Sequence, residues 1–477
     1  MALATRAGAQ ERIESLLDPG SFEPLRSAVR SGALGERARA GDGVLAGCGC
    51  VDGRPLCCYA QEGAFLGGSL GAAGAGTLVE LYRYARRALL PVVGFIDSAG
   101  ARLQEGLPAL AGYGALFRAQ VSASGLLPQI AILCGNAAGG SAYSPALCDF
   151  VVMSEQAAMF LTGPGVVAAV TGESVDAEAL GGLLVHARNG TAHLYAAGCD
   201  HASELARALL SHLPSSARSP LPCRAPAPPA AGDPGALVPS DPRRVYDMRA
   251  LARTLLDRGE LLEISPRHAR NLLCALGFLA GIPVGVIASQ PRYLGGVLDG
   301  ASGSKGARFV RTCSAYGLPL IVLVDTPGFL PGARQEREGV IRQGAKLLHA
   351  FAEARVPRLT VIIRKAFGGA YIAMNCKTLG ADRVFAWPTA QIGVMGAQQA
   401  LPFLHRRELA GSAEPELARA VLAARYEREQ LSAQRALECG LVDELIAPDQ
   451  TRERLTRVLT PLVGAARPRP RIRNIPL

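Results

Sequence analysis

Residues 137–153, AAGGSAYSPALCDFVVM, begin inside a stretch from Ala119 to Cys148 that contains no charged side chain. A similar segment, AFGGAYIAMNCKTLGADRVFAW, occupies residues 366–387. In both segments a Gly-Gly pair follows an apolar run typical of a buried strand and precedes a segment typical of a helix. The recurrence of this pattern in each half of the chain indicates an internal repeat.

The spacing of matched residues supports a duplication. Asp97 and Asp325 each end a Leu-Pro-led apolar run and lie 228 positions apart, and the first glycines of the two pairs, Gly139 and Gly368, lie 229 positions apart. Short β-branched runs alternate with helical patterns such as 76–90 and 338–355, which is typical of α/β layers.

The sequence therefore predicts an α/β fold made of two duplicated domains, at residues 1–220 and 240–477. Residues 214–242 are rich in Pro, Ala and Ser and lack periodicity, so we expect a linker between the domains.

Composition narrows the class of protein. The formal charge is +10, yet no basic run is interleaved with aromatic residues and there is one Trp, which argues against nucleic-acid binding. Diffuse positive charge suits anionic small substrates such as phosphorylated cofactors. No apolar run reaches membrane-spanning length and the first residues lack a hydrophobic signal core, so we expect a cytoplasmic protein without a membrane partner.

Twelve cysteines are present, and four of them cluster at Cys48, Cys50, Cys57 and Cys58. Their spacing is C-x-C followed by C-C, which differs from the paired C-x-x-C knuckles of zinc sites. We therefore expect no metal on this chain. In a cytoplasmic protein the scattered thiols are expected to remain reduced.

The Gly-Gly turns suggest a chemistry. We expect a strand at 130–134 and a helix that begins near Gly140 and Ser141. The first amides of a helix lack internal partners and carry positive partial charge, so two of them can form an oxyanion hole for an enolate or a tetrahedral adduct. Close helix–strand packing also explains a single Gly-Gly pair, but two equivalent pairs favour two holes for two carbonyl-bearing substrates.

Other catalytic motifs are missing from the sequence. It contains no G-x-S-x-G elbow, no Walker A motif and no dinucleotide-binding fingerprint after a strand. Asp97 and Asp325 end strands, where they could serve as acids or as cap and turn residues, and the pattern leaves both roles open.

On these residues and on further motifs, the sequence resembles the carboxyltransferase (β) subunits of biotin-dependent acyl-CoA carboxylases of the propionyl-CoA/acetyl-CoA type. The resemblance runs nearly from end to end. The further motifs include LLDPGSF (16–22), GARLQEG (100–106), FLTGPGVVAAVTGE (160–173), KGARFVRTCSAYGLPLIVLVDTPGFLPG (305–332) and NIPL (474–477).

The resemblance implies two crotonase-like (ClpP/crotonase) domains and a reaction that transfers the carboxyl group of N-carboxybiotin to the α-carbon of a short-chain acyl-CoA through an enolate. It assigns Gly139 and Gly140 to the thioester oxygen, and Gly369 and Ala370 to the biotin ureido oxygen. Gly368 is a further contact to biotin. The residues implied in substrate binding are Ala138, Ser141, Tyr371 and Ile372. An apolar residue at position 372 goes with tolerance of more than one acyl length.

The resemblance also implies partners. No Met is followed by Lys, so the biotin attachment sequence is absent from this chain, and no ATP-binding carboxylase domain is present. A separate α-type subunit is therefore expected to supply the biotin carboxylase and the biotin carrier. The family implies a hexamer of stacked dimers, in which the N half of one chain and the C half of its partner share an active site.

Some residues depart from the family pattern. Ala72 and Thr77 stand where the family usually has Glu and Lys, Asn136 and Ala137 replace Pro-Cys, and residues 431–446 replace an Asn-Pro-Tyr segment. Two alternatives stay open on the sequence alone: a carboxyltransferase subunit of a biotin-dependent decarboxylase or transcarboxylase, and a non-catalytic scaffold paralogue, because a fold by itself does not establish a function.

Overall fold

A computed structural model describes residues 7–464 and 473–474 of the chain. It contains two compact units. Unit 1 extends to Pro222 and takes in Ser265–His268 and residues 473–474, and unit 2 begins at Cys223. This start precedes residue 240 because the second part of the expected linker packs on unit 2, where the amide of Arg224 donates to the carbonyl of Gly281 at 2.9 Å.

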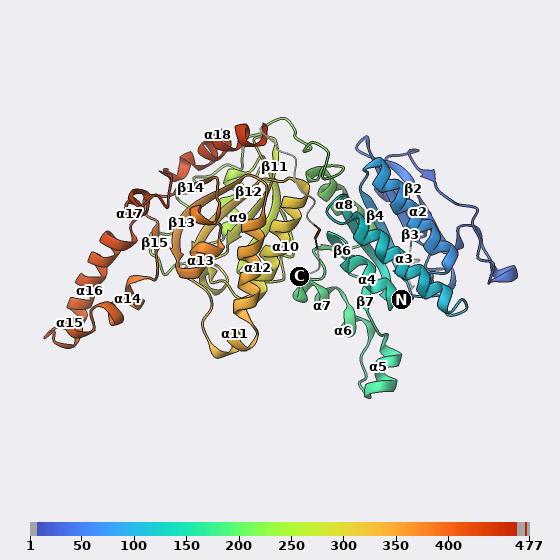
Figure 1. Ribbon diagram of the computed structural model, residues 1–477, viewed down its shortest axis with the longest axis horizontal. Coiled ribbons are helices and arrows are strands. Elements are labelled where there is room, and N and C mark those ends of the chain that lie inside the picture. Colours follow the sequence, from blue (N-terminus) through green and yellow to red (C-terminus); the bar gives the residue numbers. More distant parts are fainter. Residues whose placement is uncertain (1–6, 465–472, 475–477) are drawn as a thin grey trace. The chain divides into compact units, whose positions relative to one another are not determined.

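Unit 1 is built on an eight-stranded sheet in the order β1-β2-β3-β4-β5-β6-β8, with β7 paired to the end of β5 (Figure 1). The hairpins β1–β2 and β2–β3 are antiparallel, and the other pairings are parallel. The strands are β1 (Glu23–Pro24), β2 (Val44–Val51), β3 (Arg54–Gln61), β4 (Val92–Ser98), β5 (Gln129–Ala138), β6 (Phe150–Ser154), β7 (Ala158–Phe160) and β8 (Leu194–Ala196).

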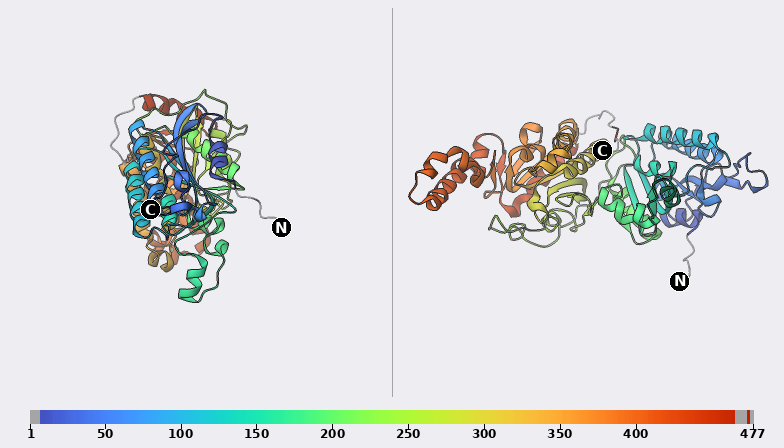
Figure 2. Two further views of the ribbon diagram at one scale, coloured as in Figure 1. Left: turned by 90° about the vertical axis from the view of Figure 1, so that its right-hand side faces the viewer. Right: turned by 90° about the horizontal axis from the view of Figure 1, so that it is seen from below.

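Helices cover both faces of this sheet. Helices α2 and α3 lie along one face, and α1 and α8 pack together on the other (Figure 2). In α2 the buried residues Leu78, Leu81, Tyr82 and Ala85 recur at helical spacing, which forms the stripe that faces the sheet. The helices are α1 (Ala9–Leu16), α2 (Ala72–Ala88), α3 (Leu107–Ala123), α4 (Gly140–Ala146), α5 (Pro164–Thr171), α6 (Ala177–Gly181), α7 (Leu183–Asn189) and α8 (Cys199–His212).

Unit 2 repeats the plan of unit 1. Its sheet has the order β16-β14-β13-β12-β11-β10-β9, with β15 paired to the end of β13. The strands are β9 (Leu262–Glu263), β10 (Leu272–Leu279), β11 (Ile282–Ser289), β12 (Leu320–Thr326), β13 (Arg358–Phe367), β14 (Arg383–Ala386), β15 (Gln391–Gly393) and β16 (Glu444–Leu445). The predicted duplication of an α/β domain is confirmed.

The helices of unit 2 follow the same scheme, because α10 packs against α12 while α9 and α18 join the sheet in one hydrophobic core. They are α9 (Met248–Leu255), α10 (Gly300–Tyr316), α11 (Ala333–Arg337), α12 (Val340–Glu353), α13 (Gly368–Ala373), α14 (Ala397–Leu404), α15 (Arg406–Ala410), α16 (Pro415–Tyr426), α17 (Ala433–Glu438) and α18 (Thr451–Gly464). Helices α2 and α12 confirm the helices predicted at 76–90 and 338–355.

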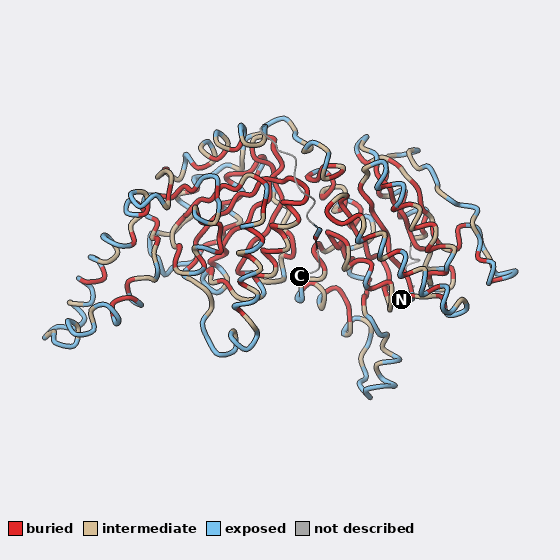
Figure 3. The backbone as a smooth tube through the Cα atoms, viewed as in Figure 1, coloured by how far each residue is buried: buried red, intermediate tan, exposed pale blue. Residues whose placement is uncertain are grey.

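The strands form the cores of both units. Every residue of β4 and β12 is buried, and Figure 3 shows the central strands of each sheet buried along their length. The mainly apolar strands β10, β11 and β12 are buried at every position, as expected for strands covered on both faces. Within the described ranges, no helix combines the length and apolarity needed to cross a membrane.

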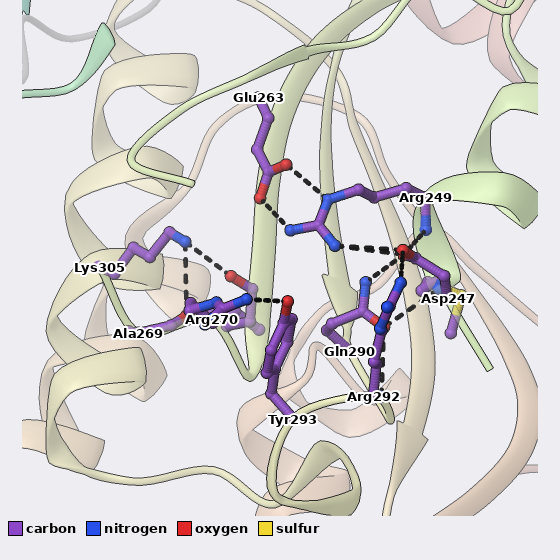
Figure 4. A network of polar contacts seen from close by, with 11 residues as sticks. Asp247, Arg249, Glu263, Ala269, Arg270, Gln290, Arg292, Tyr293 and Lys305 are labelled. Carbon is purple, nitrogen blue, oxygen red and sulfur yellow. Dashed lines mark hydrogen bonds and ion pairs between the residues drawn. The ribbon is translucent and has the colours of Figure 1, made fainter. Parts of the chain in front are cut away.

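Polar contacts connect several elements of unit 2 near β9 and β10 (Figure 4). The buried ammonium of Lys305 donates to the carbonyl of Leu272 at 2.8 Å, and burial lowers the pKa of this lysine. Arg249 joins the carboxylate of Glu263 at 2.6 Å to that of Asp247. The network therefore ties α9, α10 and the β9–β10 hairpin together.

The structure contains one departure from the expected thiol chemistry. Cys134 on β5 and Cys199 at the start of α8 form a disulfide, whereas reduced cysteines were expected. The sequence could not indicate this pair, because the two residues are 65 positions apart and meet only when α8 packs on the sheet. Cys48 and Cys57 face each other across β2 and β3 with their sulfurs 3.4 Å apart and remain free thiols.

Candidate active site

The two Gly-Gly pairs form equivalent turns. In unit 1, β5 ends at Ala138, Gly139 has φ 60° and ψ −128°, and α4 begins at Gly140. In unit 2, Gly368 follows the last residue of β13 and has φ 58°. A positive φ of this size favours glycine. The duplication therefore preserves one backbone conformation at the end of the fifth strand of each unit.

The hydrogen bonds of the first turn show which amides can serve a ligand. The amide of Gly139 donates to the carbonyl of Phe160 on β7 at 3.1 Å, so it is already occupied. Gly140 and Ser141 are the first two residues of α4, where amides have no partner within the helix. Among the described residues, no segment outside the helix accepts a hydrogen bond from either amide.

The expected role of Gly139 and Gly140 as the donor pair stays a prediction, and the hydrogen bond between the Gly139 amide and Phe160 favours a pair shifted by one residue. The amides open to a ligand in unit 1 belong to Gly140 and Ser141. An offset of 229 relates these two residues to Gly369 and Ala370, which are the pair expected in unit 2. If the donor pair of unit 1 is Gly140 and Ser141, the two turns offer their amides at equivalent positions.

Side chains hold the first turn in place. The hydroxyl oxygen of Ser141 lies 2.8 Å from the carbonyl of Ala138 and 3.0 Å from that of Ser98, so its one proton can be donated to either carbonyl and the side chain holds the turn from within. The ring of Tyr113 on α3 lies beneath Gly140, where a Cβ atom would come within 3.2 Å of it. Sequence reasoning missed Tyr113, because the contact depends on how α3 crosses α4.

The second turn has different surroundings. A Cβ atom on Gly369 would lie 3.7 Å from the ring of Phe329, which is an ordinary contact distance. Ala370 is fully buried, and Ile372 is 44% exposed on the same short helix. Burial raises the pKa of Tyr371 to about 12, so its phenol is neutral at physiological pH. The residues next to the amides are thus uncharged.

The two strand-end aspartates are engaged in ion pairs. Asp97 contacts Arg12 of α1 at 2.8 Å, and both side chains are buried. Asp325 contacts Arg364 at 3.1 Å, and burial raises the pKa of Asp325. These contacts explain both aspartates as anchors that connect the central strands to neighbouring segments.

The residue change at Ala72 is compensated in the structure. The carboxylate of Glu105 accepts a hydrogen bond from the amide of Ala72 at 2.7 Å, and Asp42 accepts one from the amide of Gly74 at 2.9 Å. Arg102 contacts both carboxylates. The start of α2 is therefore capped by acids from other segments, although position 72 itself carries no acid.

The comparison with known protein families explains these features. Residues 4–474 match the family model described as the carboxyl transferase domain. The chain belongs to the carboxyl transferase family. It is 46% identical over 492 residues to the propionyl-CoA carboxylase beta chain of Saccharopolyspora erythraea, with 98% of this chain and 90% of that protein covered.

Two further comparisons agree. The chain is 44% identical to the biotin-dependent acetyl-/propionyl-coenzyme A carboxylase beta5 subunit of Mycobacterium tuberculosis, with 93% of this chain and 84% of that protein covered. Its fold matches a crystal structure of transcarboxylase 12S, a hexamer assembly with methylmalonyl-coenzyme A bound. That match has a TM-score of 0.93 and 40% identity, and it covers 98% of this chain and 91% of the other. This carboxyltransferase is thus an enzyme with two crotonase-like units, as the resemblance implied.

Proposed function

We propose that this carboxyltransferase moves the carboxyl group of carboxybiotin, carried on a separate subunit, to the α-carbon of a short-chain acyl-CoA. The observation that carries the proposal is the match across both units to a carboxyltransferase that binds methylmalonyl-coenzyme A. The equivalent turns of the two units support it, because each offers a pair of amides to one carbonyl oxygen.

The role of unit 1 is to stabilise an enolate. In the proposal, the amides of Gly140 and Ser141 donate to the thioester oxygen of the acyl-CoA. Negative charge grows on this oxygen when the α-proton leaves, and preorganised amides stabilise that charge without reorganising. The stretch from Ala119 to Cys148 carries no charged side chain, so few ions compete with these hydrogen bonds.

The role of unit 2 is to hold the biotin end of the reaction. The second turn fits a neutral ureido carbonyl, because its amides are flanked by Phe329, Tyr371 and Ile372 and by no charged group of their own helix. In the proposal, Gly369 and Ala370 donate to the ureido oxygen, and Gly368 supplies the turn. Bound carboxybiotin supplies the carboxyl group as carbon dioxide and a nitrogen that accepts the α-proton.

Substrate selection is assigned to the residues around the turns. Ile372 is 44% exposed, and we assign it to the wall of the acyl pocket, where its apolar side chain admits acetyl, propionyl and butyryl groups. We also assign Ala138 and Tyr371 to substrate binding. Ser141 takes part through its backbone amide.

The assembly follows from the same relatives. We propose a hexamer built of stacked dimers that works with an α-type subunit bearing the biotin carboxylase and the biotin carrier, located in the cytoplasm. The support is the hexameric transcarboxylase 12S and the biotin-dependent subunit from Mycobacterium tuberculosis. The carboxyltransferase subunit of a biotin-dependent transcarboxylase is the second candidate, favoured by 40% identity to the methylmalonyl-CoA carboxyltransferase 12S subunit of Propionibacterium freudenreichii.

The decisive experiment is a carboxylation assay with labelled bicarbonate, ATP, a biotinylated partner and a panel of acyl-CoAs. We expect label in the acyl-CoA product for at least one short chain. Transfer from methylmalonyl-CoA to carrier biotin without ATP, together with no ATP-dependent labelling, would favour the transcarboxylase. No transfer in either direction would leave the scaffold interpretation as the better one.

A further inference from the structure

The connection between the first two strands is much longer in unit 1 than in unit 2. Residues 25–43 join β1 to β2, whereas residues 264–271 join β9 to β10. We call residues 25–43 the basic loop, because four exposed arginines lie in it against one exposed glutamate. These arginines are Arg26, Arg30, Arg37 and Arg39. Unit 1, which we assign to the acyl-CoA, thus carries a cationic segment beyond the shared fold.

Comparison of the two units shows that Arg26 lies where unit 2 has a lysine. An offset of 228 relates Thr77 of α2 to Lys305 of α10. In unit 2, the ammonium of Lys305 is buried and bonded to backbone carbonyls. In unit 1, the equivalent residue Thr77 carries no charge. The Nε of Arg26 donates to its hydroxyl at 3.3 Å, so a cation from the basic loop lies at this position instead.

The remaining nitrogens of Arg26 are open to a ligand. Among the described residues, no acceptor and no carboxylate pairs with its two terminal nitrogens. Arg39 is likewise exposed, and its guanidinium lies 5.4 Å from the ring centroid of Phe65. Unit 1 therefore presents guanidinium groups at the surface near α2, whereas the equivalent cation of unit 2 is buried.

The basic loop lies at the same edge of the sheet as the first turn. Helix α2 follows the carboxyl end of β3, and α4 follows the carboxyl end of β5 in the same parallel set. Ligands of open α/β sheets bind outside this edge. A terminal nitrogen of Arg26 lies 3.9 Å from where a Cβ of Gly76 would be.

Helix α3 links the two places. A Cβ on Gly112 would come within 2.7 Å of Ala75 in the first turn of α2. The next residue, Tyr113, lies beneath Gly140. A continuous chain of contacts through α2 and α3 therefore connects Arg26 to the first turn of α4, and the inference takes the pantetheine arm to run along it.

We propose that the basic loop binds the phosphate groups of the nucleotide part of the acyl-CoA, with Arg26 as its principal contact and Arg39 beside it. Guanidinium groups bind phosphate oxygens in a bidentate manner and stay charged at every working pH. This inference rests on the proposed function, since it takes the thioester end of the same molecule to lie at Gly140.

The test compares Arg26→Ala with a matched control. Arg87→Ala removes an exposed arginine from the opposite end of α2 and so makes the same change in net charge. We expect Arg26→Ala to raise the KM for acyl-CoA about tenfold, the effect of losing one charge-assisted hydrogen bond. Its kcat and its KM for the biotin carrier should stay at wild-type values, as should all parameters of Arg87→Ala.

A truncated substrate separates phosphate recognition from a structural effect. With acyl-pantetheine, which lacks the nucleotide, wild type and Arg26→Ala should have the same KM. The inference would be overturned if Arg26→Ala raised the KM for acyl-pantetheine as much as the KM for acyl-CoA. It would also be overturned if the KM for acyl-CoA did not change. A raised KM for the carrier instead would show that the loop docks an acidic protein segment, and that also overturns it.

Calorimetric binding of free CoA tests the inference apart from catalysis. Arg26→Ala should bind CoA about tenfold more weakly than wild type, and inorganic phosphate should compete. If wild type binds CoA in this way yet transfers no carboxyl group, the proposed function fails while the phosphate site stands. Equal CoA affinity in both proteins overturns the phosphate site alone.

Discussion

Replacing Gly140 with alanine should lower kcat about a hundredfold in a protein that still folds. The new Cβ would lie 3.2 Å from Cγ of Tyr113 and 3.3 Å from each of its Cδ atoms, closer than the roughly 3.5–4.0 Å of an ordinary carbon contact. Tyr113 is 3% exposed within a packed core, so the start of α4 must shift by a few tenths of an ångström. Losing one aligned oxyanion donor costs about 2.7–4 kcal/mol, or about 10²–10³ in kcat.

The assay is steady-state carboxylation of acyl-CoA with the biotinylated partner, combined with thermal unfolding. Gly114→Ala is the control, because it adds the same methyl group to the helix that bears Tyr113, in a place with no atom within 4 Å. It should leave kcat unchanged. Adding Tyr113→Leu to Gly140→Ala removes the ring and should recover part of the activity, which a double-mutant cycle measures. Wild-type kcat in Gly140→Ala would refute the assignment of this turn to the thioester oxygen.

Three further predictions follow from other features. Ile372→Asp should narrow the acyl preference, and equal relative kcat/KM for acetyl-, propionyl- and butyryl-CoA before and after the change would exclude the pocket role. Burial lowers the folded-state pKa of Lys305, so the free energy of unfolding should rise with pH between that value and pH 10.5 and be unaffected by this group below it. Urea unfolding should show a weaker rise in Lys305→Met, and identical pH profiles of the two proteins would contradict this prediction. Denatured protein should contain ten reactive thiols without reductant and twelve with it, since Cys134 and Cys199 are paired; twelve in both cases would exclude the disulfide.

The sequence predicted those parts of the fold that depend on local pattern. Near-constant offsets between Asp97 and Asp325 and between Gly139 and Gly368 were enough to predict two α/β units, because strand and helix periodicity survives duplication. The start of α4 at Gly140 was predicted for the same reason. Glycine pairs mark a turn that only a positive φ can make, and that requirement is visible in one chain.

The missing parts depend on contacts between distant segments. Which amide is free in the first turn is decided by Phe160, whose strand pairs with the end of β5. The side chain that packs against Gly140 is Tyr113, which belongs to a different helix. The change from Lys to Thr77 suggested a lost cation, yet Arg26 reaches the same place from a loop 51 residues earlier. Sequence offsets locate equivalent positions, but they do not identify the side chains that fill the space around them.

The two units show how one duplicated turn can serve two different oxygens. Gly139 and Gly368 keep φ at 60° and 58°, so the direction of the helix amides is conserved. The surroundings have diverged: a tyrosine ring presses on Gly140, whereas an ordinary contact separates Gly369 from Phe329. A thioester oxygen that gains charge needs amides held rigidly, because any movement weakens their hydrogen bonds when the enolate forms. A ureido oxygen on a mobile carrier must instead enter and leave. Tight packing beneath the first turn and looser packing beneath the second therefore match the separate tasks that we assign to them.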